Sequence, residues 1–148
     1  MKIISKNKKA YHEYEILEEL QVGIELLGPE VKSLRGGGCN LKGSFCRIMK
    51  GEVWVFDAHI SKYEYTDRFS KIEEKRTRKL LLNRKEITKW QDKLKKEQHL
   101  TIIPLYIYFN EYGKIKLKIA LCKGKKLYDK RASDKEKTIK RDLQKKEY

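Results

Sequence analysis

The chain has 148 residues, enough for one domain with its own hydrophobic core. Its 36 Lys and Arg residues outnumber 21 Asp and Glu residues, for a net charge of +15. Such an excess favours a polyanionic partner, nucleic acid first and an anionic membrane surface second. No apolar run is long enough to cross a bilayer and no signal-peptide pattern opens the chain, so we expect no membrane-spanning segment. With nucleic acid as the first choice, we predict no membrane partner.

The first 27 residues divide into a basic segment and an alternating segment. Residues 1–10 are poor in apolar side chains and predict either an ordered edge or a flexible arm. Residues 11–27 alternate with a period of two, which predicts two half-buried strands. Their outer positions are acidic, so we expect that side to turn away from a polyanion.

Residues 28–38 predict a short helix that ends at three consecutive glycines. Val31 and Leu34 lie on one face and should dock on a core, while Lys32 and Arg35 point outward. Glu30 lies in the first turn, where the helix dipole favours a carboxylate. By itself the segment is typical of a solvated connector helix. Among the basic clusters described below, Glu30 becomes a candidate exposed carboxylate that accepts hydrogen bonds from base amino groups.

The middle of the chain predicts a hairpin, a long loop and a helix. Residues 44–49 and 52–57 flank Lys50-Gly51, a hairpin pattern whose second strand is apolar on both faces and should be central. Residues 59–77 lack a clear period and predict a long loop. Residues 80–82 fit either a buried strand or a first helical turn. Residues 83–97 predict a helix in which Asn83 and Glu86 form a capping box.

The last third predicts a second hairpin and a tail. Residues 101–109 and 115–122 form its strands, and Pro104 suggests an edge or a bulge because it donates no ladder hydrogen bond. Residues 124–148 are rich in Lys and Arg and carry few apolar side chains. We expect this tail to be disordered when free and helical on a partner.

The predicted fold is mainly β, with added helices. About six antiparallel strands and two to three helices suit a small closed or nearly closed barrel of the oligonucleotide-binding type. We therefore predict a barrel domain over residues 1–123 and a separate basic tail over residues 124–148.

Catalytic and metal-binding patterns give little support for an enzyme. The histidines lack ligand spacing, and neither a phosphate-binding loop nor a nucleophile elbow is present. The three cysteines predict free thiols in a reducing cytosol, and we expect no metal or cofactor. The histidines are His12, His59 and His99, and the cysteines are Cys39, Cys46 and Cys122. A metal-dependent nuclease built from Asp57, Glu64 and Asp67 with a histidine is possible in principle, but their spacing does not favour it.

Clusters of cations beside aromatic residues point instead to RNA. Phosphates bind Arg and Lys, and unstacked bases stack on aromatic faces. One cluster is Arg76-Thr77-Arg78-Lys79, and Arg84-Lys85 follows it. Another comprises Lys125-Lys126 and Lys130-Arg131, which bracket Leu127-Tyr128-Asp129. Several such clusters with this net charge and no catalytic set favour a binding protein.

Four motifs in order resemble the small protein B family, the SsrA-binding proteins of bacterial trans-translation. They are Asn7-Lys8-Lys9-Ala10, residues 28–35, residues 76–82 and residues 124–131. The resemblance implies an oligonucleotide-binding-type barrel that binds transfer-messenger RNA and delivers it to stalled ribosomes. It also implies a cytoplasmic bacterial protein without a cofactor, and we expect a monomer.

The resemblance also implies which residues meet RNA. The implied RNA-binding residues are Asn7, Lys8, Lys9, Glu30, Lys32, Arg35, Arg76, Arg78, Lys79, Lys125 and Lys126. Asp129, Lys130 and Arg131 match the segment that occupies the ribosomal decoding centre, with the tail beyond in the empty message channel as a helix. The alternative is a generic single-stranded RNA-binding or ribosome-assembly barrel that stacks bases on Tyr63, Tyr65 and Phe69.

Overall fold

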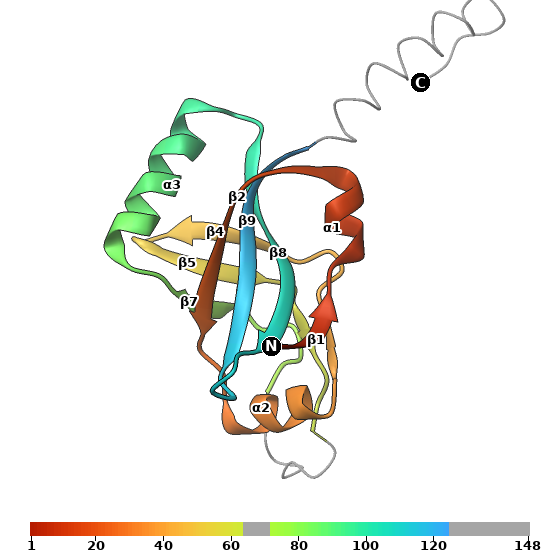
Figure 1. Ribbon diagram of the computed structural model, residues 1–148. Coiled ribbons are helices and arrows are strands. Elements are labelled where there is room, and N and C mark those ends of the chain that lie inside the picture. The colour runs from red at the N-terminus through yellow and green to blue at the C-terminus, as the bar shows by residue number, and fades with distance from the viewer. Residues whose placement is uncertain (64–71, 125–148) are drawn as a thin grey trace, which may run out of the picture.

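The computed structural model describes residues 1–63 and 72–124, which form a closed antiparallel barrel (Figure 1). The strands are β1 (Lys2–Lys6), β2 (Tyr14–Ile24), β3 (Cys39–Asn40), β4 (Phe45–Met49), β5 (Glu52–Phe56), β6 (His59–Ile60), β7 (Arg78–Leu81), β8 (Leu100–Phe109) and β9 (Ile115–Gly124). The helices are α1 (Lys8–Glu13), α2 (Gly28–Arg35) and α3 (Arg84–Lys96). The main sheet runs β1-β8-β4-β5-β7-β2-β9, and β9 also pairs with β8. This second pairing closes β8-β4-β5-β7-β2-β9 into a ring, which confirms the predicted barrel.

The two predicted hairpins form as expected. Lys50 and Gly51 have φ angles of 52° and 75°, the left-handed pair that a tight two-residue hairpin turn requires. In the second strand of this hairpin, β5, Val53 and Val55 are fully buried between β4 and β7. The β8–β9 hairpin carries a register shift between Pro104 and Tyr106, the bulge that the proline suggested.

The prediction of two strands over residues 11–27 is wrong. Tyr11 lies in α1, and β2 is one strand of 11 residues that pairs with β9 from Tyr14 opposite Gly124 to Gly23 opposite Lys116. A bulge between Ile16 and Glu18 absorbs the break in alternation, so the strand continues instead of turning. Of the alternatives for residues 1–10, the ordered edge is correct for β1, which pairs with the second half of β8, while Lys8 to Ala10 begin α1.

The segment between the two hairpins differs from the prediction in part. His59–Ile60 is not loop: it forms β6 and pairs with Cys39–Asn40. Of the open alternatives for residues 80–82, the strand is correct, because Leu80 and Leu81 belong to β7. Tyr65 and Phe69 lie outside the described residues.

Helix α3 follows the prediction closely. The Asn83 side chain accepts a hydrogen bond from the Glu86 backbone, and the Glu86 side chain accepts one from the Asn83 backbone. Ile87 and Trp90 are buried against the barrel. Within the described residues, neither this helix nor another is long and apolar enough to span a bilayer.

Strand β9 is covered on both faces near its end. Its inward side chains join the barrel core, while Ala120 and Cys122 pack outward against Ala10 of α1. The three cysteines are free thiols, and burial raises the pKa of Cys39 to about 11 and that of Cys122 to about 12. Strand β9 extends to Gly124, one residue past the predicted end of the barrel domain at residue 123. The predicted tail beyond it lies outside the described residues.

Candidate RNA interface

Helix α2 lies across the lower end of the barrel in Figure 1, and its first turn carries Glu30, which forms ion pairs with Arg76 and Arg78. The helix starts at Gly28-Pro29 and ends at Arg35, after which Gly37 takes a φ of 80°. Leu34 is buried and Val31 is half-buried, as expected for the inward face. Lys32 and Arg35 are exposed.

Glu30 does not belong to the exposed face. It is only 3% exposed, because its carboxylate points to Arg76 at the end of the long loop and Arg78 at the start of β7. Glu30 Oε1 accepts bonds from Arg76 Nη2 at 2.6 Å and from the Leu27 backbone N–H at 2.9 Å. Glu30 Oε2 accepts bonds from Arg76 Nε at 3.0 Å and Arg78 Nε at 2.8 Å. The prediction that Glu30 is displayed on the exposed face is therefore wrong.

The pKa of Glu30 is set by two opposing effects. Burial disfavours the charged carboxylate and would raise the pKa. Hydrogen bonds from Arg76 and Arg78, and from the Leu27 backbone, outweigh burial and hold the pKa below its usual value. Glu30 is thus charged at neutral pH.

Arg78 is fully buried and ties the residue before β6 to the end of the loop that precedes β7. Its Nη1 donates to the carbonyl of Ala58 at 2.7 Å and to that of Arg76 at 3.2 Å. Its Nη2 donates to the carbonyl of Glu74 at 3.0 Å. The expected RNA contact by Arg78 is not available in this arrangement, because every contact described for its guanidinium is internal.

The remaining cations around α2 reach the surface. Arg76 keeps 27% of its side chain exposed, and Lys32 lies over the Tyr63 ring with 5.7 Å from Nζ to the centroid. We call Lys32, Arg35 and Arg76 the α2 surface. Lys79 is half-buried on β7 and pairs with Glu52 at 3.8 Å.

Helix α1 forms a second basic surface, the α1 surface, made of Lys8 and Lys9. Lys8 is exposed, and Lys9 pairs loosely with Glu13 one turn on, at 3.6 Å. Asn7 is 5% exposed and holds the helix in place. Its backbone N–H donates to Leu105 at 2.7 Å, its Nδ2 donates to the Pro104 carbonyl at 3.0 Å, and its Oδ1 caps the first turn.

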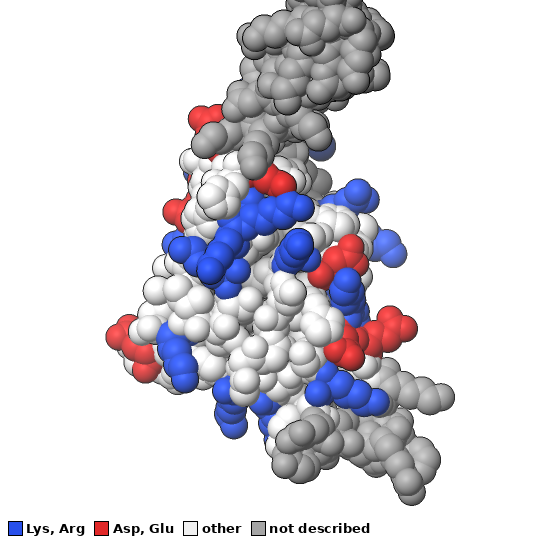
Figure 2. Space-filling model, turned by 90° about the vertical axis from the view of Figure 1, so that its right-hand side faces the viewer, with Lys and Arg blue, Asp and Glu red and all other residues white. Residues whose placement is uncertain are grey.

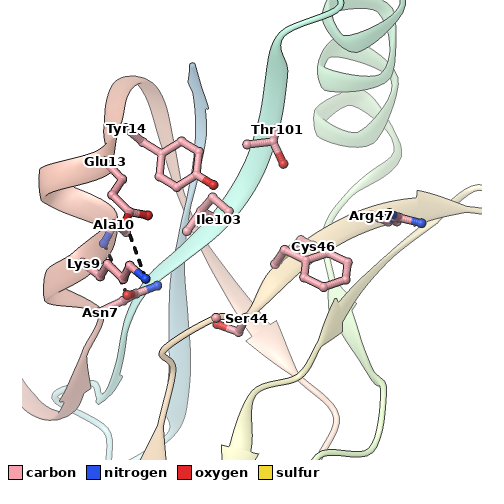
Figure 3. A pocket seen from close by; sticks show the side chains of 12 residues that line it. Asn7, Lys9, Ala10, Glu13, Tyr14, Ser44, Cys46, Arg47, Thr101 and Ile103 are labelled. Atoms are coloured by element: carbon pink, nitrogen blue, oxygen red, sulfur yellow. Dashed lines mark hydrogen bonds and ion pairs between the residues drawn. The ribbon is translucent and has the colours of Figure 1, made fainter. Parts of the chain in front are cut away.

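A hollow of about 360 Å³ separates α1 from β4. Strand β8 pairs with β4 at Cys46 opposite Ile102, and further along it pairs with β1. The hollow opens between these two pairings. Figure 3 shows Lys9 and Tyr14 on one wall and Arg47 beyond the other, with Ile103 of β8 between them. The Arg47 guanidinium lies 5.2 Å from the Phe45 ring centroid.

Arg47 and Phe45 were not predicted as site residues. Their separation by two on a predicted strand places both side chains on one face, and a cation beside an aromatic ring there is a signal that the sequence contained.

The structure brings some predicted residues together and separates others. Glu30, Arg76 and Arg78 form one network, whereas Asn7, Lys8 and Lys9 lie on α1, beside the upper half of the barrel in Figure 1. Figure 2 faces the side that lies on the right in Figure 1, and shows Lys and Arg groups towards the top and bottom, a mainly uncharged centre, and basic and acidic groups mixed along the right-hand edge. The predicted residues Lys125, Lys126, Asp129, Lys130 and Arg131 lie outside the described residues.

The described part of the chain contains no group of three His, Cys, Asp or Glu side chains placed to hold a metal ion. Of the carboxylates weighed for a nuclease, Asp57 is exposed at the end of β5, and Glu64 and Asp67 lie outside the described residues. His59 pairs with Glu74, 2.6 Å from Nε2 to Oε2. The described site offers cations and aromatic rings, the side chains that suit contacts with an anionic polymer.

These features define a class of protein: a small antiparallel barrel of the oligonucleotide-binding type with basic helices on its outside. Comparison with known proteins narrows the class. The family model described as SmpB protein matches residues 4–147, and the chain belongs to this family.

Relatives and a solved structure agree over nearly the whole length. An SsrA-binding protein of Helicobacter hepaticus (strain ATCC 51449 / 3B1) is 54% identical over 142 residues, which cover 96% of this chain and 91% of that protein. One of Helicobacter pylori (strain Shi470) is 50% identical over 143 residues, or 97% and 93% of the two chains. A chain in the solved structure described as "tmRNA-SmpB: a journey to the center of the bacterial ribosome" has a TM-score of 0.70 and 40% identity, with 97% of both chains covered.

Proposed function

We propose that this protein binds transfer-messenger RNA and delivers it to stalled ribosomes, as an adaptor in trans-translation. The observation that carries the proposal is the 40% identity, over 97% of both chains, to the chain in the tmRNA–SmpB ribosome structure. The net charge of +15 supports it, because a polyanion relieves the repulsion among so many cations.

The RNA-binding role is assigned to side chains that can reach a phosphate. These are Lys8 and Lys9 of the α1 surface together with Lys32, Arg35 and Arg76 of the α2 surface, all exposed or half-exposed. Asn7 and Arg78 support these surfaces from beneath through internal hydrogen bonds. Lys79, Lys125 and Lys126 are further candidates for phosphate contacts.

A competition assay tests the proposed RNA partner. The protein is titrated with the folded tRNA-like domain of transfer-messenger RNA and with an unstructured RNA of the same length, at one stated salt concentration. We expect the folded RNA to bind more tightly. Equal affinity for both RNAs would favour the generic single-stranded RNA-binding or ribosome-assembly barrel instead, with bases stacked on aromatic rings such as Tyr63.

The second part of the proposal concerns the basic tail. We assign Asp129, Lys130 and Arg131 to the ribosomal decoding centre, and the residues after them to the empty message channel. A chain that lacks residues 132–148 should keep its affinity for the RNA and lose ribosome rescue in a reconstituted translation assay. Loss of RNA affinity in this truncated chain would contradict the division into an RNA-binding barrel and a ribosome-binding tail.

We also propose that the protein is a cytoplasmic, monomeric binding protein and not an enzyme, with no metal cofactor. Incubation of the bound RNA with Mg²⁺ or Mn²⁺ tests this. The RNA should remain intact over many hours, and cleavage that a metal chelator stops would establish a nuclease.

A further inference from the structure

Glu30 is a negative charge in the middle of a basic surface, and its contacts explain how it can assist the binding of an anion. Its two oxygens accept four hydrogen bonds, two from Arg76, one from Arg78 Nε and one from the Leu27 backbone, and Arg78 Nη2 adds an ion pair with Oε2 at 2.6 Å. With 3% of its surface exposed, no free lone pair faces solvent for a base amino group. An RNA contact by Glu30 would have to displace an arginine from a buried ion pair.

We infer that Glu30 is a positioning residue for RNA binding: it fixes the guanidinium of Arg76 at the surface, and Arg76 contacts the RNA phosphate. This inference rests on the proposed function. Glu30 makes no direct contact with RNA in this arrangement. Its carboxylate assists RNA binding only by orienting the guanidinium of Arg76.

The geometry of Arg76 fits this role. Its Nε and Nη2 atoms are both bound to Glu30 in the bidentate manner, which fixes the plane of the guanidinium. Nη2 also donates to the Glu25 carbonyl at 3.4 Å. Nη1 has no hydrogen-bond partner among residues 1–63 and 72–124, and 27% of the side chain is exposed. A fixed guanidinium with a free N–H edge loses little entropy when a phosphate binds.

Arg78 makes the arrangement rigid. It shares Glu30 Oε2 with Arg76 and also binds the carbonyl of Arg76 itself at 3.2 Å. The backbone and the side chain of Arg76 are therefore both anchored to the same carboxylate, one through Arg78 and one directly. Loss of the carboxylate releases Arg76 at both points.

A double-mutant cycle on RNA affinity tests the inference. Four chains are compared on the folded tRNA-like RNA: wild type, Glu30→Gln, Arg76→Ala and the double variant. We expect each single change to weaken binding about tenfold, and Glu30→Gln to cost less than about twofold once Arg76 is already alanine. An unchanged tenfold loss in the Arg76→Ala background would overturn the inference and assign Glu30 a direct contact.

The salt dependence of binding gives a second readout. A lost phosphate contact lowers the slope of log K against log salt by about 0.7 to 0.9. We expect this decrease for Arg76→Ala and also for Glu30→Gln. A Glu30→Gln slope equal to that of wild type would overturn the inference, because a carboxylate that only contacts a base releases no counterion.

Glu25→Gln is the matched control, since it removes the same charge from an exposed side chain just before α2. It should bind RNA as tightly as wild type or slightly more tightly. A tenfold loss in this control would show that any carboxylate here matters, and would overturn the assignment to Glu30.

Glu30→Asp covers the case in which Glu30→Gln does not fold. It keeps the charge but is shorter, so we expect a several-fold loss that again vanishes in the Arg76→Ala background. Circular dichroism at the assay temperature confirms that each chain is folded. A wild-type chain that fails to bind the RNA contradicts the proposed function, whereas an additive cycle on a wild-type chain that binds contradicts the positioning role alone.

Discussion

The α1 and α2 surfaces both present cations, but they are built in opposite ways. At α1 the charges are exposed, and the only ion pair described within the helix is the loose contact of Lys9 with Glu13. At α2 the charges continue inward as a buried network of Glu30, Arg76 and Arg78. The difference separates two functions of charge: at α1 the cations only project from the surface, whereas at α2 the charged groups also hold the backbone in place. Substitutions should therefore change affinity alone at α1, and affinity together with stability at α2.

The largest expected effect is the loss of stability when Glu30 is removed. Glu30→Ala leaves Arg78 charged and fully buried without its partner, and this should lower the free energy of unfolding by about 3–5 kcal/mol. Urea denaturation measures it. Glu25→Ala, at an exposed carboxylate, should change the value by less than about 0.5 kcal/mol. Equal effects of the two substitutions would remove the distinction between the two surfaces.

Acid should weaken the α2 network once it protonates Glu30. The pKa of Glu30 in the folded chain lies below its usual value of 4.5, so its stabilising effect is present above that pH and is lost as the pH falls through the lowered pKa. Urea denaturation from about pH 6 to pH 3 should show a decline that is smaller in Glu30→Gln.

Glu18 supplies a comparison for this pH dependence. Lys93 and Lys89 lower its pKa by hydrogen bonding, but the pairs are more exposed than those of Glu30. Glu18→Gln should therefore leave most of the acid dependence in place. The reverse ranking of the two variants would argue that α3, and not α2, holds the acid-sensitive contact.

A smaller loss of stability is expected at the base of α1. Asn7→Ala removes the helix cap and leaves the Pro104 carbonyl without its donor, at a cost of about 1–2 kcal/mol. Thermal unfolding measures this effect. A loss of stability as large as that for Glu30→Ala would show that the contacts of α1 stabilise the fold as much as those of α2.

The smallest effect on stability should come from the lysines of α1. Lys8→Ala and Lys9→Ala should shift the free energy of unfolding by less than about 0.5 kcal/mol. Each should still weaken RNA binding several-fold and reduce its salt dependence by about one phosphate contact. A loss of stability without a loss of RNA affinity would show that these lysines stabilise the fold and do not bind RNA.

Local signals explain what the sequence allowed us to predict. Lys50-Gly51 specifies a hairpin turn, and the capping box of Asn83 and Glu86 specifies where α3 begins, because each signal lies within a few residues. Alternation then places the strands, and hairpins imply an antiparallel barrel. The family motifs identified the residues around α2 without indicating how they face one another.

What could not be predicted depends on contacts between distant residues. Glu30 meets Arg76 and Arg78 across 46 and 48 positions, so no local pattern separates this buried carboxylate from an exposed one. Likewise, the six residues of α1 are too few to be stable alone, and they form a helix because Asn7 bonds to Pro104 and Ala10 packs under β8 and β9. The bulge that keeps β2 continuous depends on its pairing with β9.

The pairing of β2 with β9 also sets the order in which the chain can fold. Tyr14 lies opposite Gly124, so the ring cannot close until almost the entire barrel sequence has been synthesised. The β4–β5 hairpin pairs residues only a few positions apart and can form early. Closure through such distant pairing carries a large loop entropy, and domains of this topology fold in milliseconds to seconds. During translation, one edge of β2 therefore stays unpaired until β9, the last strand of the barrel, has been synthesised.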